Sequence, residues 1–232
     1  MAAASSSSLV DFVVDRASIL ERIDERVASL DVDNRTFERL YEEYTYLRQA
    51  SRMDLALAKA VDLIACLEAN AKATGGEPEQ DLKAVAVFNL ASALHQLGHF
   101  SIAKPFYTEA IMGLDNAPRN PFLCCLPDIR PSQVQYMKLR MEEANRGVIP
   151  EALTYLDGDG IEQQWTEYEI SIARKKSDTI EHIMHAEATA RKKPKPAAVG
   201  PGGMKLSLNV NAANSNRGKA YPITSTPRKE LW

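Results

Sequence analysis

Apolar side chains recur three and four positions apart through residues 84 to 114, which is the spacing that lines one face of a helix. Gly98 interrupts this run and can end a helix, because glycine adopts left-handed backbone angles without penalty. A second apolar run begins near Ser101. The pattern therefore predicts two helices folded against each other as a hairpin. Its apolar positions are Val87, Leu90, Ala91, Leu94, Leu97, Ala103, Phe106, Tyr107, Ala110 and Ile111.

The same periodicity predicts three helices before this hairpin and two after it. Asn34 is a candidate cap for the second of them. Residues 74–80 contain two glycines and a proline and are predicted to form a loop, and prolines between residues 118 and 131 exclude a continuous helix there. No strand is expected in the first 190 residues. The five further helices are predicted at residues 9–30, 36–50, 52–73, 132–146 and 161–193.

Two further segments repeat, more weakly, the spacing found around Gly98. In the predicted hairpin, an aromatic residue follows the glycine by two positions and an alanine follows it by five. We interpret the two segments as degenerate copies, so that residues 9–160 form a stack of about three helical hairpins and the helix at 161–193 caps it. The matching sets are Gly98, Phe100 and Ala103; Ser51, Met53 and Ala56; and Gly147, Ile149 and Ala152, with Pro150 at the first position of an expected helix.

The stretch from 84 to 114 resembles a tetratricopeptide repeat (TPR). A turn glycine separates two sets of apolar and small residues, as in the family pattern. Two positions depart from it, because Val87 stands where Trp is common and Pro105 lies inside the second helix. The alternative is a helical hairpin unrelated to the family. The nine matching positions are Val87, Leu90, Ala91, Leu94, Gly98, Phe100, Ala103, Tyr107 and Ala110.

The resemblance implies an all-α fold, a short array of antiparallel helical hairpins whose concave face holds a peptide or a helix. It also implies an adaptor or an assembly scaffold. Family members that grip a C-terminal carboxylate do so with Lys, Arg and Asn side chains on the first helices of successive repeats. Asn89 and Lys138 match two of these clamp positions, and His95 is included among the candidate partner-binding residues. Other clamp positions are changed to Tyr41, Thr45 and Val134.

Charge is unevenly distributed along the chain. The formal net charge is only -3, yet residues 190–232 contain nine Lys or Arg and a single acid, so the rest of the chain is acidic. Residues 1–8 and 194–232 are predicted to be disordered, because Ser, Pro, Gly and Asn dominate there. Within the tail, residues 204–211 alternate apolar and polar and either add to a sheet edge of another protein or remain disordered. The candidate partner-binding residues of this basic region are Arg191, Lys192, Lys193, Lys195, Tyr221 and Trp232.

Composition and cysteine usage indicate one soluble domain with an appendage. No apolar run is long enough to cross a membrane, and the first residues lack the features of a secretory signal. The three cysteines Cys66, Cys124 and Cys125 have no metal-binding spacing, and their odd number favours reduced thiols in the cytoplasm. A redox role for the adjacent pair is the alternative.

No arrangement of residues indicates catalysis, a metal or a cofactor. His95 and His99, and likewise His182 and His185, are spaced to share a helix face, but neither pair has the cysteine or carboxylate partners of a known zinc site. Residues 157–160 lack the Lys and Ser or Thr of a phosphate-binding loop and the further oxygen ligands of a calcium loop. An enzyme is therefore the less favoured class.

Two functions fit these observations. The first is a protein-binding adaptor or a structural subunit of a larger assembly, which includes cytoskeletal or ciliary particles, where the basic tail suits an acidic surface such as that of tubulin. The second is an RNA-associated protein whose tail meets phosphates. A third hypothesis is that the tail folds back onto the acidic body.

Overall fold

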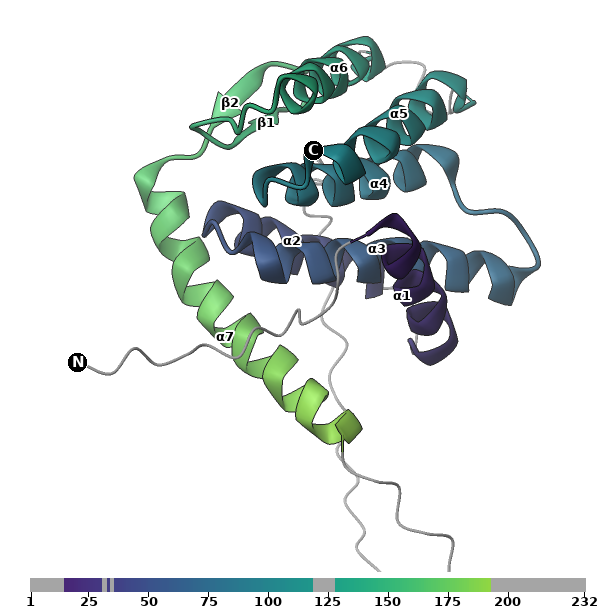
Figure 1. Cartoon of the computed structure of the whole chain (residues 1–232). Helices are drawn as coiled ribbons and strands as arrows, with labels where there is room; N and C mark the ends of the chain where they lie inside the picture. The colour runs from purple at the N-terminus through teal and green to yellow at the C-terminus, as the bar shows by residue number, and fades with distance from the viewer. Residues whose placement is uncertain (1–14, 31–32, 34–35, 119–127, 193–232) are drawn as a thin grey trace, which may run out of the picture.

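The computed structural model describes residues 15–30, 33, 36–118 and 128–192 (Figure 1). These residues are mostly helical, which confirms the predicted all-α class, although a small sheet is also present. The elements in chain order are α1 (Arg16–Ser29), α2 (Thr36–Gln49), α3 (Met53–Thr74), α4 (Gln80–Gln96), α5 (Phe100–Asn116), α6 (Arg130–Arg146), β1 (Thr154–Leu156), β2 (Glu162–Gln164) and α7 (Glu167–Lys192).

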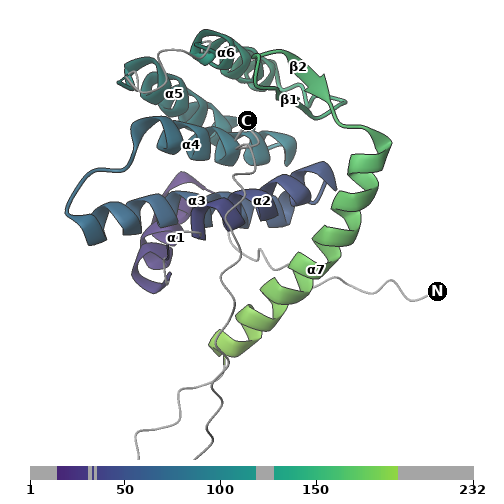
Figure 2. The same cartoon turned by 180° about the vertical axis from the view of Figure 1, so that it is seen from behind.

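Helices α2 to α6 form a stack in which each helix packs on the next one in the chain. Because short turns join α2 to α3 and α4 to α5, each of these pairs is an antiparallel hairpin. Helix α1 packs on α3, and α7 packs on α2. The view from behind shows α7 descending along one edge of the stack, away from α6 (Figure 2). The predicted hairpin at 84–114 is therefore one layer of a larger helical array.

The three positions predicted to be equivalent turns share one backbone conformation. Ser51, Gly98 and Gly147 all have positive φ, at 59°, 81° and 68°. At each turn the amide of the following residue donates to a carbonyl five positions earlier, which is the Schellman arrangement that ends a helix. The three bonds are Arg52 N to Leu47 O, His99 N to Leu94 O and Val148 N to Glu143 O.

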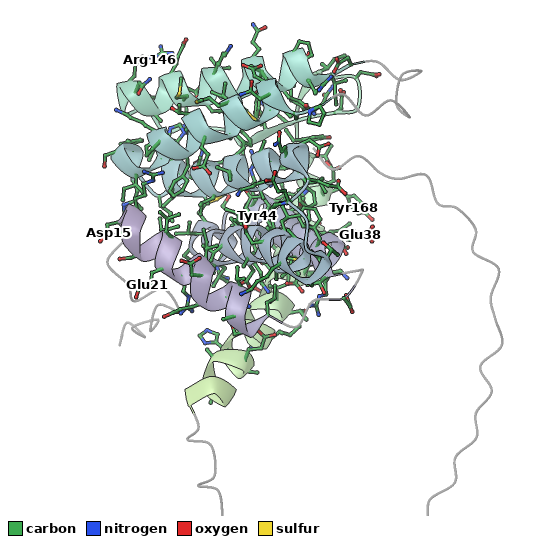
Figure 3. All side chains as sticks on the ribbon, turned by 90° about the vertical axis from the view of Figure 1, so that its right-hand side faces the viewer. Asp15, Glu21, Glu38, Tyr44, Arg146 and Tyr168 are labelled. Carbon is green, nitrogen blue, oxygen red and sulfur yellow. The ribbon has the colours of Figure 1, made fainter. Side chains whose placement is uncertain are left out.

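The core lies between the packed helices of the stack. Leu90, Ala91 and Ala103 are fully buried, as the hairpin pattern predicts. Tyr44 lies at the centre of the stack, whereas Glu38, Arg146 and Tyr168 lie on its outside, as do Asp15 and Glu21 of α1 (Figure 3). Small residues in α3 and α4 allow close packing, since the alanines of these helices that face the core have almost no exposed surface.

The prediction of a third helical hairpin is wrong for its second helix. Residues 147–166 contain no helix; residues 154–164 instead form an antiparallel two-stranded hairpin, in which Tyr155 pairs with Gln163. The carboxylate of Asp157 stabilises the turn between the strands, because it accepts from the amides of Asp159 and Ile161. The expectation of no strand before residue 190 is therefore wrong as well.

The predicted helix at 161–193 begins six residues later than expected, at Glu167. The expected boundary at residue 160 falls inside the β-hairpin turn. Helix α7 was predicted to cover the end of the stack that follows the third hairpin, but it packs on α2 at the other end. Its buried face is narrow, and the large side chain of Tyr168 is 74% exposed. The buried positions of α7 are Ala173, Ser177 and Ile180.

Helix α1 begins at Arg16, where Asp15 caps it by accepting a hydrogen bond from the Ser18 amide at 2.7 Å. This bond lowers the pKa of the Asp15 carboxyl below its ordinary value. The predicted start at residue 9, the Asn34 cap and the predictions for the two chain ends lie outside the described residues.

Candidate functional site

Strand β1 lies against side chains from α2, α4 and α6. We use the term β1 site for this surface, which these helices form together. The site lies in the part of the structure where the small sheet meets the stack (Figure 1). The residues that form the β1 site are Arg48 of α2, Phe88 of α4, and Gln133, Tyr136, Met137 and Arg140 of α6.

The backbone carbonyl of Thr154 is the central contact of the β1 site. Arg48 Nη2 and Tyr136 Oη both donate to this oxygen, each at 2.8 Å. The donors come from the first and last helices of the stack, so one carbonyl links elements far apart in the chain. Both bonds are made to the backbone of β1, so they do not depend on the identity of its side chain.

The side chain of Thr154 makes a second set of bonds. Arg140 Nη2 donates to the Thr154 hydroxyl at 2.6 Å, and that hydroxyl donates to Glu162 of β2 at 2.5 Å. Arg140 also bonds to Glu162 at 2.6 Å and, through Nη1, to Glu143 at 2.8 Å. Both carboxylates compensate the charge of the buried guanidinium, as burial requires.

Aromatic rings hold the opposite side of the hairpin. Tyr155 and Trp165 stack with ring centroids 5.4 Å apart and an interplanar angle of 15°. The guanidinium of Arg48 lies 5.2 Å from the centroid of the Trp165 ring, within cation–π range. Arg48 therefore contacts both the strand and the residue that leads into α7.

A cavity of about 30 Å³ lies between β1 and the helices. It is large enough for one small polar group and too small for most side chains. Two residues that line it, Arg48 and Gln133, have buried polar atoms without a hydrogen-bond partner in the described structure, namely Arg48 Nε and both amide atoms of Gln133. The β1 site thus retains hydrogen-bonding capacity that β1 does not use.

The structure does not bring the two predicted clamp residues together. Asn89 is buried in α4, its backbone carbonyl accepts from Tyr44 Oη of α2 at 3.1 Å, and its Nδ2 has no partner among the described residues. Burial raises the pKa of Tyr44 to about 12, so Tyr44 remains a donor at neutral pH. Lys138 is exposed and lines a separate hollow between α5 and α6. A carboxylate clamp made of Asn89 and Lys138 is therefore not formed in this conformation.

His95, predicted to be a partner-binding residue, is also buried. Its Nε2 donates to the carbonyl of Val148 at 2.8 Å, because a carbonyl can only accept. Nδ1 is then the acceptor for Tyr107 Oη at 3.1 Å. Both ring nitrogens are used by the neutral form, so His95 fastens the chain after α6 to α4 and does not face a partner.

The buried environment of His95 predicts a pH dependence of stability. Burial lowers the pKa of His95 below its ordinary value, so below about pH 6.5 the unfolded chain takes up the proton first and the free energy of unfolding falls. Above that pH, His95 makes its full contribution to the free energy of unfolding. Urea unfolding at pH 7.5 and 5.5 should therefore show a larger loss for the wild type than for His95→Gln, whose amide preserves one donor and one acceptor. Equal losses in both proteins would contradict this assignment.

The remaining predicted partner-binding residues belong to the basic C-terminal region. The backbone of Arg191 and Lys192 forms the last turn of α7. Lys193, Lys195, Tyr221 and Trp232 lie outside the described residues, and so do Cys124 and Cys125. These residues therefore remain predictions.

The histidines and the cysteine of the described residues are the candidate metal ligands and nucleophiles. They contain no cluster of three or more His, Cys, Asp or Glu side chains that could hold a metal. His99 is the N-cap residue of α5, and His185 lies 3.8 Å from Glu181. Burial raises the pKa of the Cys66 thiol to about 11, so this cysteine is neutral and unreactive at physiological pH.

Sequence reasoning missed Arg48, Tyr136, Arg140 and Thr154, the residues that hold β1. On a helix pattern, Arg48 and Arg140 are indistinguishable from exposed charged residues. A usable signal was the composition of residues 147–173, which contain six acids and no Lys or Arg. Such a segment is a natural partner for buried arginines elsewhere in the chain.

None of the helices in the described ranges is long and apolar enough to span a membrane. Comparison of the chain with family models, with curated proteins and with solved structures gives no match.

Proposed function

We propose that this protein is a non-catalytic interaction module, an adaptor or a structural subunit that binds a protein partner through its helical stack and attaches to an acidic surface through its basic tail. The observation that carries the proposal is the β1 site, in which side chains from α2 and α6 hold the backbone of an extended segment. The TPR resemblance supports the same class of function, because stacked helical hairpins typically serve to bind peptides.

Charge distribution supports the second half of the proposal. The basic region begins at the last turn of α7, which leads away from the stack (Figure 2). We infer that it contacts a surface other than the one that the helical stack contacts. An acidic protein surface, such as one of the cytoskeleton, matches its charge. Direct association with RNA is the competing outcome of the test below.

The tail is tested by neutralising it without changing the stack. The four substitutions Arg191→Gln, Lys192→Gln, Lys193→Gln and Lys195→Gln should weaken binding of the full chain to immobilised polyglutamate, with a reduced dependence on salt. The matched control changes four exposed basic residues of the body, Lys72, Arg146, Arg174 and Lys175, to Gln. Because both variants lose the same charge, only a local role of the tail predicts that they differ.

The same two variants are measured against single-stranded polyuridine. Tighter binding of the wild type to polyuridine than to polyglutamate, with a steep salt dependence that the tail substitutions abolish, would replace the protein-surface proposal by the RNA-associated one. A partner obtained by affinity purification supports the adaptor role only if the purified partner forms a stoichiometric complex with the purified chain. A chain that forms no protein complex in this reconstitution would contradict that role.

A further inference from the structure

We propose that β1 is a built-in occupant of a strand-binding site, and that an extended segment of a partner protein displaces it. In that segment a hydroxyl residue is followed by any residue and then by an aliphatic residue. This inference rests on the proposed protein-binding function and names the chemistry of the partner. It follows from what holds β1, from how little else holds the β-hairpin, and from the polar atoms that β1 leaves unpaired.

The contacts of β1 define what the site accepts. Thr154 and Leu156 point to the same face because side chains alternate along a strand, and both are buried. The carbonyl and hydroxyl of Thr154 are bound, while Leu156 packs beside the small cavity. A partner needs the same three features: a carbonyl for Arg48 and Tyr136, a hydroxyl for Arg140, and an aliphatic side chain two residues later.

The β-hairpin is small compared with the helices that it covers. Each strand has three residues, and all three residues of β2 are exposed. A two-stranded hairpin of this size is marginally stable by itself. The position of the β-hairpin therefore depends on its contacts with the β1 site. If the hairpin left the site, few apolar side chains of the hairpin itself would become exposed.

The β-hairpin also fits the β1 site imperfectly. Gln133 is 2% exposed and Arg48 is 9% exposed, yet three of their polar atoms have no partner among the described residues. A buried polar atom without a hydrogen-bond partner is energetically unfavourable. A segment that places a polar group in the cavity gains this energy, which β1 forgoes.

The charge of the β1 site also restricts which partner segments can bind. Arg140 is compensated by Glu162, which belongs to the β-hairpin and leaves with it. A displacing segment must replace this carboxylate, because a buried arginine left with fewer acceptors is costly. We therefore expect an acidic extended segment.

The experiment uses the full chain and a fluorescein-labelled peptide of residues 152–165, which carries every feature required. Gly160→Val loosens the β-hairpin, because Gly160 has a φ of +74° and an added Cβ would lie 2.9 Å from the Cβ of Ser132 in α6. Gly75→Val is the matched control: its φ is +68°, but an added Cβ meets no atom within 4 Å. Fluorescence anisotropy measures the affinity of each protein for the peptide.

Gly160→Val should bind the peptide at least about tenfold more tightly than the wild type, because the fraction of open sites limits the apparent affinity. Gly75→Val should bind like the wild type, and Arg48→Ala added to Gly160→Val should remove the gain. A folded Gly160→Val protein whose affinity equals that of the wild type would overturn the proposal, as would a gain that survives Arg48→Ala.

Two further measurements secure the result if Gly160→Val folds poorly or leaves the β-hairpin closed. A variant with residues 154–164 replaced by a Gly and Ser linker of equal length lacks the occupant and should bind the peptide. In the wild type, the amide of Asp157 should exchange with deuterium much faster than the amides of α3 and α4. Failure of the linker variant to bind, or equal exchange rates, would reject the built-in occupant. The partner complex tested above would be unaffected, so the two proposals fail separately.

Discussion

Replacing Arg26 by Met should lower the free energy of unfolding by about 3 to 5 kcal/mol, the usual cost of removing one partner from a buried ion pair. Arg26 Nε donates to Asp62 Oδ1 at 2.5 Å, and both residues are buried between α1 and α3. The substitution preserves much of the side-chain volume but leaves the Asp62 carboxylate without its cation. Urea unfolding followed by circular dichroism measures the change.

Two comparison variants separate the charge effect from the loss of packing. Arg22→Met removes an arginine of the same helix whose partner, Glu25, is exposed, and it should cost about 1 kcal/mol or less. The double variant Arg26→Met with Asp62→Leu removes both charges and should recover most of the loss. If the double variant is less stable than Arg26→Met alone, the uncompensated carboxylate is not the cause.

Leu94→Ala should cost about 2 to 5 kcal/mol, because it removes a fully buried side chain and leaves a cavity. Leu94 is completely buried in α4, and its carbonyl also accepts the bond that closes the Gly98 turn. The change therefore affects the packing of α4 and leaves the turn bond in place. Thermal and urea unfolding both report this loss.

Leu97→Ala is the control for Leu94→Ala. Leu97 lies one turn further along and is 37% exposed, so truncation should cost about 1 kcal/mol or less. Equal losses for the two leucines would mean that the apolar stripe does not define the core. That outcome would also undermine the reading of residues 84–114 as a buried layer.

The helices were predictable wherever local signals and packing agree. The expected helix at 36–50 is observed at Thr36–Gln49, and Gly98 and Gly147 end helices as predicted. Ser51 was aligned with these glycines by spacing alone and has the same left-handed conformation. A repeated turn is recoverable from sequence because few residues adopt that conformation easily.

The β-hairpin was not predictable because its strands depend on tertiary contacts. Glu162, Gln163 and Gln164 have no apolar alternation, and three residues are too few for a periodic signal. In contrast, the spacing of Gly147, Ile149 and Ala152 imitates a helical turn followed by a helix. The bonds from Arg48 and Arg140 decide the outcome, and no local pattern contains them.

The candidate site was missed for a related reason. The clamp positions were chosen by analogy with a family, and Asn89 is buried in α4. Whether such a residue is accessible depends on tertiary packing, which the family pattern does not report. Arg48 and Arg140 became visible as binding residues only when the structure placed the Thr154 carbonyl and hydroxyl against them.

The three Schellman turns are regularly spaced along the chain, and this spacing bears on the length of the helical array. Gly98 follows Ser51 by 47 residues and Gly147 follows Gly98 by 49, so each turn marks one module of nearly constant size. A series of such modules has no intrinsic terminus, since the last helix always offers a face to another. Here the chain places a short sheet on α6 in the position of the third module's second helix. The length of the array is thereby fixed by a change of secondary structure.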